Sequence, residues 1–144
     1  MLFRSIGLAA PQIGISKRIL VVDGSSIEDD DMSSFKKVFI NPVIIKEYGD
    51  TWEFEEGCLS IPGIRGGISR KSTIELSYFD EKWNKKTETF SGMQARVIQH
   101  EYDHLEGKLF IDYLSQIKRK LIKSKLNEIS KGNCDVHYKI QVAR

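Results

Sequence analysis

The sequence predicts one α+β domain, in which mixed strands pack around a central helix and a C-terminal helix and a closing strand complete the fold. Three observations predict this class: strand-type alternation in the N-terminal part, a capped helical segment at 91–107, and apolar residues at helical spacing over 114–129. The 144 residues, 40% of them hydrophobic, suffice for a single core. We therefore expect one domain over residues 1–144.

Alternating apolar and polar residues predict the strands. The expected strands are residues 19–23, 38–46, 73–79 and 87–90. Residues 80–85 should form the hairpin loop between the last two of them. Residues 24–37 are rich in serine and acidic residues and predict a surface loop.

The central helix has recognisable end signals. Ser91 can cap its N-terminus, Gln94 three residues later completes a capping box, and Gly107 provides a left-handed stop. These signals fix the helix to within one or two residues.

Two histidines and a glutamate share one face of this helix. At about 100° of rotation per residue, His100 and His104 lie about 40° apart, and Glu101 lies roughly 60° beyond His104. Imidazoles can bind a divalent metal, and a nearby carboxylate can accept a proton from water. The alternative is a chance pattern on an exposed, charged helix.

Cys58 is the candidate third ligand, because a catalytic metal site needs three protein ligands and an open position. The chain has two cysteines and no segment that resembles a secretory signal, so a disulfide is not expected. Gly57 allows close backbone approach, and Pro62 with Gly63 should fix a turn, so that a shaped loop presents the thiol. The alternative is a free thiol that packs as a small hydrophobe, which is the expectation for Cys134.

Residues 7–14, GLAAPQIG, combine small side chains with one amide. Gln12 offers a hydrogen-bond donor from a segment that Pro11 and Gly14 brace. Taken alone, this pattern is also typical of an ordinary turn or packing site.

Together, GLAAPQIG, EGCLS and QHEYDH resemble the three motifs of the peptide deformylase family, in the same order and at comparable spacing. The resemblance extends from Ile6 to the C-terminal region. It implies hydrolysis of the N-formyl group of formylmethionyl nascent peptides, with release of formate. Metal coordination can lower the pKa of water from near 16 to about 7, and one oxyanion donor can contribute about 3 kcal/mol to such a reaction.

The resemblance also implies roles for individual residues. The metal ligands would be Cys58, His100 and His104, with water as the fourth ligand. Glu101 would act as general base and then as general acid. Gln12 and the backbone N–H of Leu59 would hold the carbonyl oxygen.

Substrate contacts are also implied by the resemblance. They would come from Ile6, Gly7, Phe54, Gly57, Met93 and Val97. The apolar members would line a pocket for methionine, and ordinary core packing is their alternative role. Backbone groups near Ile6, Gly7 and Gly57 would pair with the substrate peptide as a strand does.

The ligand types alone do not select the metal. One thiolate and two imidazoles suit zinc, iron, cobalt or nickel. The resemblance favours Fe(II). Neighbouring polar side chains should orient the histidines, and the candidates are Glu55, Glu56 and Gln99.

Charge and hydropathy limit the partners. A net charge of +2 does not by itself indicate nucleic-acid binding, so no specific DNA is expected. No apolar stretch reaches about 18 residues, so no membrane span is expected, and a bacterial-type cytoplasmic location is implied by the resemblance. The basic helix over 114–129 is either a docked terminal helix with a solvated side or a ribosome contact. Residues 137–142 predict the closing strand, and His137 is expected to be neither catalytic nor a ligand.

One departure from the family pattern concerns the N-terminus. Family members carry a helix and strands before the first motif, which begins here at Gly7, so the N-terminal part of the family fold is expected to be missing. Two other interpretations stay open: a zinc endopeptidase, since many metalloproteases share the helix motif, and an inactive remnant that at most binds peptide or metal.

Overall fold

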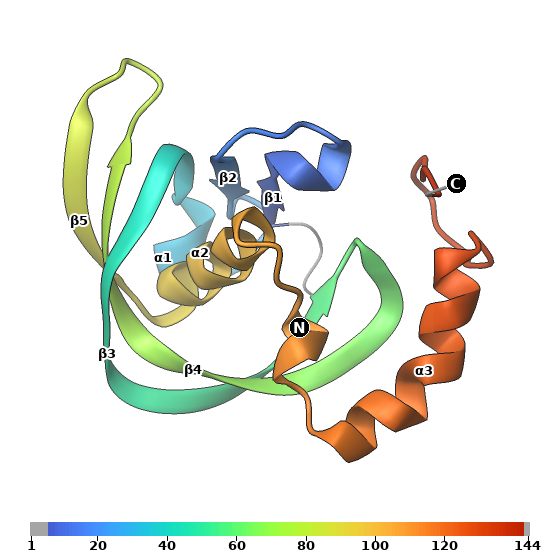
Figure 1. Ribbon diagram of the computed structural model, residues 1–144. Helices are drawn as coiled ribbons and strands as arrows, with labels where there is room; N and C mark the ends of the chain where they lie inside the picture. Colours follow the sequence, from blue (N-terminus) through green and yellow to red (C-terminus); the bar gives the residue numbers. More distant parts are fainter. Residues whose placement is uncertain (1–5, 143–144) are drawn as a thin grey trace.

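The computed structural model describes residues 6–142. A five-stranded sheet with the order β1-β2-β3-β4-β5 curves around one helix, α2 (Figure 1). The strands are β1 (Gly7–Ala9), β2 (Ile19–Asp23), β3 (Lys36–Cys58), β4 (Ile61–Phe79) and β5 (Lys85–Ser91). The helices are η1 (Ala10–Ile13), α1 (Asp30–Ser33), α2 (Gly92–Leu105), η2 (Phe110–Tyr113) and α3 (Gln116–Ser130). The α+β class is confirmed, and each strand pairing within the described part is antiparallel.

The predicted helix around the two histidines is α2, and its start differs in one detail. Ser91 is the N-cap residue with extended backbone, but its side chain makes no capping hydrogen bond. The Gln94 amide donates instead to the carbonyl of Asp31, at 2.9 Å. The expected capping hydrogen bond of Ser91 is therefore absent, and Gln94 instead ties the first turn of α2 to α1.

The long β3–β4 hairpin is the main difference from the predicted strands. Cys58 pairs with Ile61, so the chain reverses through the two residues Leu59 and Ser60. The loop expected around Cys58 is therefore wrong, and Pro62 and Gly63 lie within β4. Polar, exposed residues dominate this part of β3, and its Gly49-Asp50 pair is typical of a turn, so the local sequence does not indicate one continuous strand.

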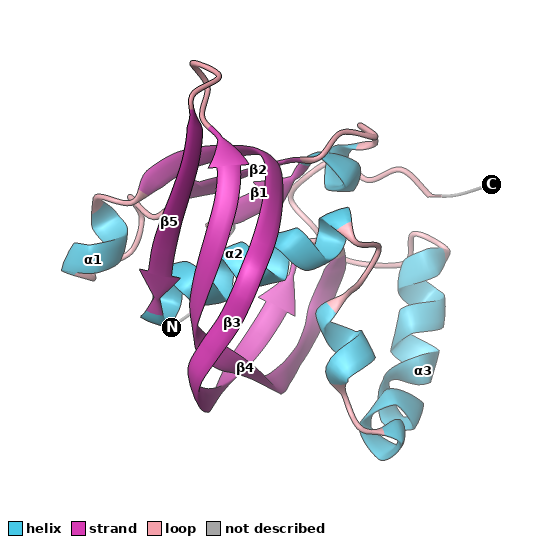
Figure 2. Cartoon of the chain, turned by 60° about the vertical axis from the view of Figure 1, so that its left-hand side comes forward, coloured by secondary structure: helices cyan, strands magenta, loops and turns pink. Residues whose placement is uncertain are grey.

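Two apolar clusters hold these elements together. The first lies between the sheet and α2, where Phe39 packs on Tyr78 and Phe90 at ring-centroid distances of 4.7 and 5.7 Å. The second lies where the tip of the β3–β4 hairpin meets η2 and α3, and contains Ile61, Ile64, Ile68, Phe110 and Leu114. Figure 2 shows α2 against the sheet and α3 beside the hairpin end. Cys58 packs against the second cluster, so this cluster supports the thiol.

The predicted C-terminal helix is present as α3, whereas the closing strand is wrong. Residues 137–142 have no strand partner among the described residues. Tyr138, Ile140 and Val142 remain 38–45% exposed. Their alternation does not form a strand, because no described strand pairs with this segment to supply ladder hydrogen bonds. No described helix is long and apolar enough to cross a membrane.

Candidate metal centre

Three side chains from two elements converge at one point. Cys58 comes from the end of β3, and His100 and His104 come from successive turns of α2. One ligand atom of each lies within 4.8 Å of those of the other two, and Cys58 Sγ lies 3.3 Å from His104 Nε2. The imidazole rings are 5.3 Å apart at their centroids and nearly perpendicular. A cysteine and two histidines that follow it by 42 and 46 positions thus form one compact donor set.

This donor set fits a transition-metal ion. A thiolate and two imidazoles are ligands for a divalent ion in tetrahedral geometry, and three protein ligands leave one position for water. Burial opposes ionisation of the Cys58 thiol, but hydrogen bonds and charge from His100 and His104 outweigh it and lower the pKa of the thiol to about 5. The sulfur is therefore a thiolate at neutral pH, which is the form that binds metal.

His100 is held from behind by a buried carboxylate. Its Nδ1 lies 2.9 Å from Glu56 Oε2, which leaves Nε2 as the nitrogen that can bind metal. Burial disfavours the charged imidazole, but hydrogen bonds to Cys58 and Glu56 raise the pKa of His100 to about 10. In the metal-free protein His100 therefore carries a proton, and metal binding must release it.

Two arginines hold Glu56 in turn. Arg70 donates to both carboxylate oxygens, at 2.7 and 3.0 Å, and Arg96 donates to Oε1 at 2.9 Å. The remaining Arg70 nitrogen donates to Asp103 at 2.8 Å. Burial raises the pKa of Glu56, but hydrogen bonds with His100 and Arg70 and their charges prevail and lower it to about 2. Two guanidinium groups thus face two carboxylates, so the formal charges of this buried network balance.

Arg96 also ties the network to the backbone of the hairpin. It donates to the carbonyls of Ile68 at 2.8 Å and Trp52 at 2.6 Å, and its guanidinium carbon lies 4.3 Å from the centre of the Trp52 ring. The network therefore joins β3, β4 and α2 directly behind His100.

Glu101 lies beside the donor set with a free oxygen. The residue is 5% exposed, and its Oε2 has no hydrogen-bond partner within the described part of the chain. Burial raises the pKa of this carboxyl to about 7, against the opposing charges of His100 and His104. Gly7 makes room for it, because a Cβ there would lie 2.5 Å from Glu101 Cγ. A buried carboxyl with an unused acceptor suits proton transfer to or from a small molecule.

Gln12 approaches the same turn from the N-terminal segment. Its Oε1 accepts a hydrogen bond from the N–H of Ala9 at 2.8 Å, which orients the amide. Its Nε2 lies 3.2 Å from Ser60 Oγ and 3.6 Å from Cys58 Sγ. Leu59, whose N–H is the other expected donor, lies in that turn and is half-exposed.

The expected substrate contacts occupy different surroundings. Ile6 and Val97 are buried in the first cluster, and Met93 packs against it. Phe54 lies 5.6 Å from the Trp52 ring and 5.9 Å from the Arg96 guanidinium carbon. Gly57 pairs with Arg65 in the hairpin. Gly7 lies against Glu101, where an added Cβ would clash with the glutamate side chain.

Sequence reasoning found one of the supporting residues and missed three. Glu56 contacts His100, whereas Gln99 donates to the carbonyls of Ala95 and Lys71, and Glu55 is exposed. The missed residues are Arg70, Arg96 and Asp103. Helical spacing offered a signal for two of them, because positions 96, 100 and 103 share one face of a helix. The strand position of Arg70 offered none.

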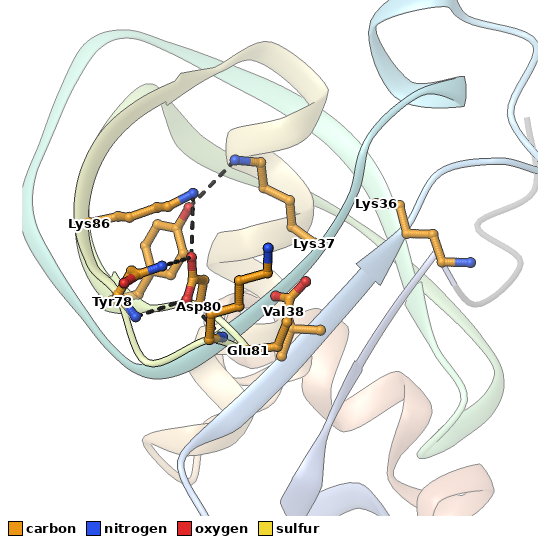
Figure 3. A pocket seen from close by; sticks show the side chains of 9 residues that line it. Lys36, Lys37, Val38, Tyr78, Asp80, Glu81 and Lys86 are labelled. Atoms are coloured by element: carbon orange, nitrogen blue, oxygen red, sulfur yellow. Dashed lines mark hydrogen bonds and ion pairs between the residues drawn. The ribbon is translucent and has the colours of Figure 1, made fainter.

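A separate hollow of about 400 Å³ lies at the β4–β5 end of the sheet (Figure 3). Its lining residues are Lys36, Lys37, Val38, Tyr78, Asp80, Glu81, Lys82, Asn84 and Lys86. The charges there are largely paired, with Lys37 3.0 Å from Glu88 and Lys86 3.6 Å from Asp80. None of the expected site residues lines this hollow.

Comparison with known proteins gives a consistent result. The sequence pattern of the family described as "Polypeptide deformylase" matches residues 2–120. A peptide deformylase of Cytophaga hutchinsonii is 52% identical over 136 residues, which cover 94% of this chain and 74% of the relative. One of Christiangramia forsetii is 51% identical over 145 residues, with the same two coverages.

Solved structures are also similar. A peptide deformylase from Plasmodium falciparum superimposes with a TM-score of 0.78 at 38% identity, covering 93% of this chain and 77% of that one. One from Synechococcus elongatus, in complex with actinonin, gives a TM-score of 0.73 at 41% identity. The match covers 83% of this chain and 65% of that structure's chain.

Proposed function

The chain belongs to the polypeptide deformylase family, and from this membership we propose that Cys58, His100 and His104 hold the single metal ion of its active site. The reaction is hydrolysis of the N-formyl group from the N-terminal formylmethionine of a nascent peptide, with release of formate. The observation that carries the assignment is the convergence of one thiol and two imidazoles from distant segments within 4.8 Å.

The ion and Glu101 have complementary tasks. When bound, the ion acts as a Lewis acid and lowers the pKa of water to about 7. Glu101 takes the proton of the attacking water and delivers it to the departing amine nitrogen. Its burial, its unpaired Oε2 and its contact with Gly7 support this role. General acid–base catalysis of this kind contributes about 10²–10⁴ in rate.

Gln12 and the backbone N–H of Leu59 stabilise the negative charge that develops on the formyl oxygen. The position of the Gln12 amide beside the turn after Cys58 supports this proposal. A single well-placed donor contributes about 3 kcal/mol to such a transition state.

The methionine side chain is held by apolar residues just before β1 and along α2. Ile6, Met93 and Val97 belong to or contact one apolar cluster, which supports a common location. Phe54 is the fourth apolar candidate, and backbone groups of Gly7 and Gly57 pair with the peptide. A flexible thioether needs no polar partner in such surroundings.

Fe(II) is the proposed native metal, and zinc, nickel or cobalt would be alternative outcomes of a metal analysis. The soft thiolate supports a transition metal but does not choose among these. Protein purified without oxygen and analysed for metal content tests the choice.

A ribosomal partner is proposed for α3. The helix carries five exposed basic residues, Lys118, Arg119, Lys120, Lys123 and Lys125, and exposes Ile117 and Leu121 by 73% and 78%. Its half-buried residues Ile122, Leu126 and Ile129 pack against the second cluster, and Lys125 donates to the carbonyl of Gly63 at 2.6 Å. Such a basic face is attracted to the phosphates of ribosomal RNA.

The decisive assay measures formate release from formyl-Met-Ala by the metal-loaded protein, beside cleavage of an internal peptide bond. Formate release that stops on chelation and returns with metal supports the proposal. Internal cleavage without formate release would instead indicate an endopeptidase.

A further inference from the structure

The segment after α3 returns to the turn that carries the metal-binding thiol. Gly132, with a φ of +84°, lies just beyond the helix end, and the N–H of Asn133 donates to the carbonyl of Glu128. The chain then turns and continues beyond the end of α3, as Figure 1 shows. The Tyr138 hydroxyl donates to the carbonyl oxygen of Leu59 at 2.7 Å. The C-terminal segment therefore contacts the hairpin tip directly.

That carbonyl and the amide facing the thiol belong to the same peptide unit. The Leu59 carbonyl is bonded to the nitrogen of Ser60, and the Ser60 N–H donates to Cys58 Sγ at 3.4 Å. In a planar trans peptide the C=O and N–H point in opposite directions. Tyr138 therefore fixes one end of a rigid unit whose other end points at the sulfur.

The same turn is also contacted from the N-terminal side. Gln12 Nε2 lies 3.2 Å from Ser60 Oγ. A rotation of the Leu59–Ser60 peptide would move the N–H away from the sulfur and displace the Ser60 side chain that Gln12 contacts. The orientation of this one peptide thus affects two groups of the active site.

We infer that Tyr138 is a positioning residue for the Cys58 thiolate, acting through the Leu59–Ser60 peptide. The inference rests on the proposed role of Cys58 as a metal ligand. Hydrogen bonds to a ligating atom orient it and tune its strength as a donor, and loss of such partners costs about 10–100-fold in metal affinity or activity. Because Tyr138 acts through a peptide, we expect an effect near the lower end of this range.

Tyr138→Phe tests the inference, because it removes the hydroxyl and keeps the ring. Tyr48→Phe is the matched control, since Tyr48 lies ten residues before Cys58 on β3 and its ring contacts Lys46. Both variants and the wild type are loaded with Co(II). The measurements are the sulfur-to-cobalt charge-transfer band and the rate of cobalt loss to excess EDTA.

In Tyr138→Phe we expect a shifted band and cobalt loss about tenfold faster than in the wild type. Tyr48→Phe should match the wild type in both measurements. An unchanged band and an unchanged rate in Tyr138→Phe would overturn the inference. If the wild type itself shows no sulfur-to-cobalt band, the proposed metal site fails instead, so the two failures are distinguishable.

A measurement on the unmutated protein adds an independent check. In the zinc-loaded wild type, the Ser60 amide hydrogen should exchange with D₂O at least about tenfold more slowly than an exposed amide, because it is held on the sulfur. In Tyr138→Phe its NMR resonance should move upfield. Free exchange of this amide in the wild type would also overturn the inference.

Discussion

Glu56 Oε2 lies 2.9 Å from His100 Nδ1, and Glu56 is itself held by two arginines that come from a strand and from the helix of the histidine. The carboxylate therefore cannot turn away from the imidazole without breaking charged hydrogen bonds. The result is a histidine whose ring orientation is set before any metal arrives.

The first prediction concerns this carboxylate. Glu56→Gln should weaken metal binding about 10–100-fold, because the amide holds His100 less firmly. It should also lower the free energy of unfolding by about 3–5 kcal/mol, because the buried Arg96 then has no carboxylate partner and Arg70 keeps only Asp103. Chelator competition and urea unfolding measure the two effects. Glu55→Gln, on an exposed neighbour, is the control and should change neither.

The second prediction separates the proposed base from the metal ligands. Glu101→Ala should retain the metal and lose about 10²–10⁴ in kcat, whereas Cys58→Ala should lose the metal. Metal content and formate release measured on the same samples check both variants. Substantial turnover in Glu101→Ala would refute the assigned base.

Gly7→Ala provides the third prediction. The added Cβ would lie 2.5 Å from Glu101 Cγ, so the carboxyl must move, and kcat should fall while metal content stays. Gly7→Ala should also destabilise the wild type more than it destabilises Glu101→Ala, where the clashing side chain is gone. Urea unfolding of the four proteins in this cycle gives the comparison. If Gly7→Ala lowers the free energy of unfolding equally in the wild type and in Glu101→Ala, its destabilising effect does not come from the contact with Glu101.

The fourth prediction is a pH dependence of the metal-free protein. Burial raises the pKa of Glu101 from its usual 4.5 to about 7, so the folded protein keeps a proton there that the unfolded chain releases. The contribution of Glu101 to the free energy of unfolding should therefore fall as pH rises from about 4.5 to about 7. The Glu101→Gln side chain stays neutral and lacks this contribution. The difference in free energy of unfolding between the wild type and Glu101→Gln, measured with urea, should therefore change between about pH 4.5 and about pH 7. A difference that does not change with pH would contradict the raised pKa.

The fifth prediction concerns α3. Replacing Lys118, Lys120 and Lys123 with alanine should weaken ribosome binding and reduce its salt dependence, because fewer phosphates are neutralised. Formate release from formyl-Met-Ala should not change. The control replaces Lys82, Lys85 and Lys86, which lie at the β4–β5 hairpin. Binding that is equally weak in both triple variants would indicate general charge attraction rather than a contact by α3.

The sequence predicted the parts of this molecule that depend on local periodicity. The strand at residues 19–23 coincides with β2, and the helix that carries His100 and His104 was located to within a residue or two. Two histidines four residues apart must share a face in any α-helix, so their proximity follows from local geometry alone.

Features that depend on distant contacts could not be predicted in this way. The part of β3 around Trp52 carries exposed glutamates, and it is a strand because β4 pairs with it along its length. Arg70 is buried because Glu56 and Asp103 meet it there, and no short segment contains all three. The alternation at 137–142 predicted a strand, but the fold supplies no partner for it among the described residues.

Each strand of the sheet pairs with the strand next to it in sequence. Contacts between sequence neighbours close short loops and form quickly, so hairpins can assemble in the order in which the chain is made. Cys58 at the hairpin tip joins the two histidines only after α2, which begins more than thirty residues later, has packed against the sheet. If these residues bind the metal as proposed, we expect capture of the ion to be a late step of maturation, because a chain that ends before α2 has the thiol without its imidazoles.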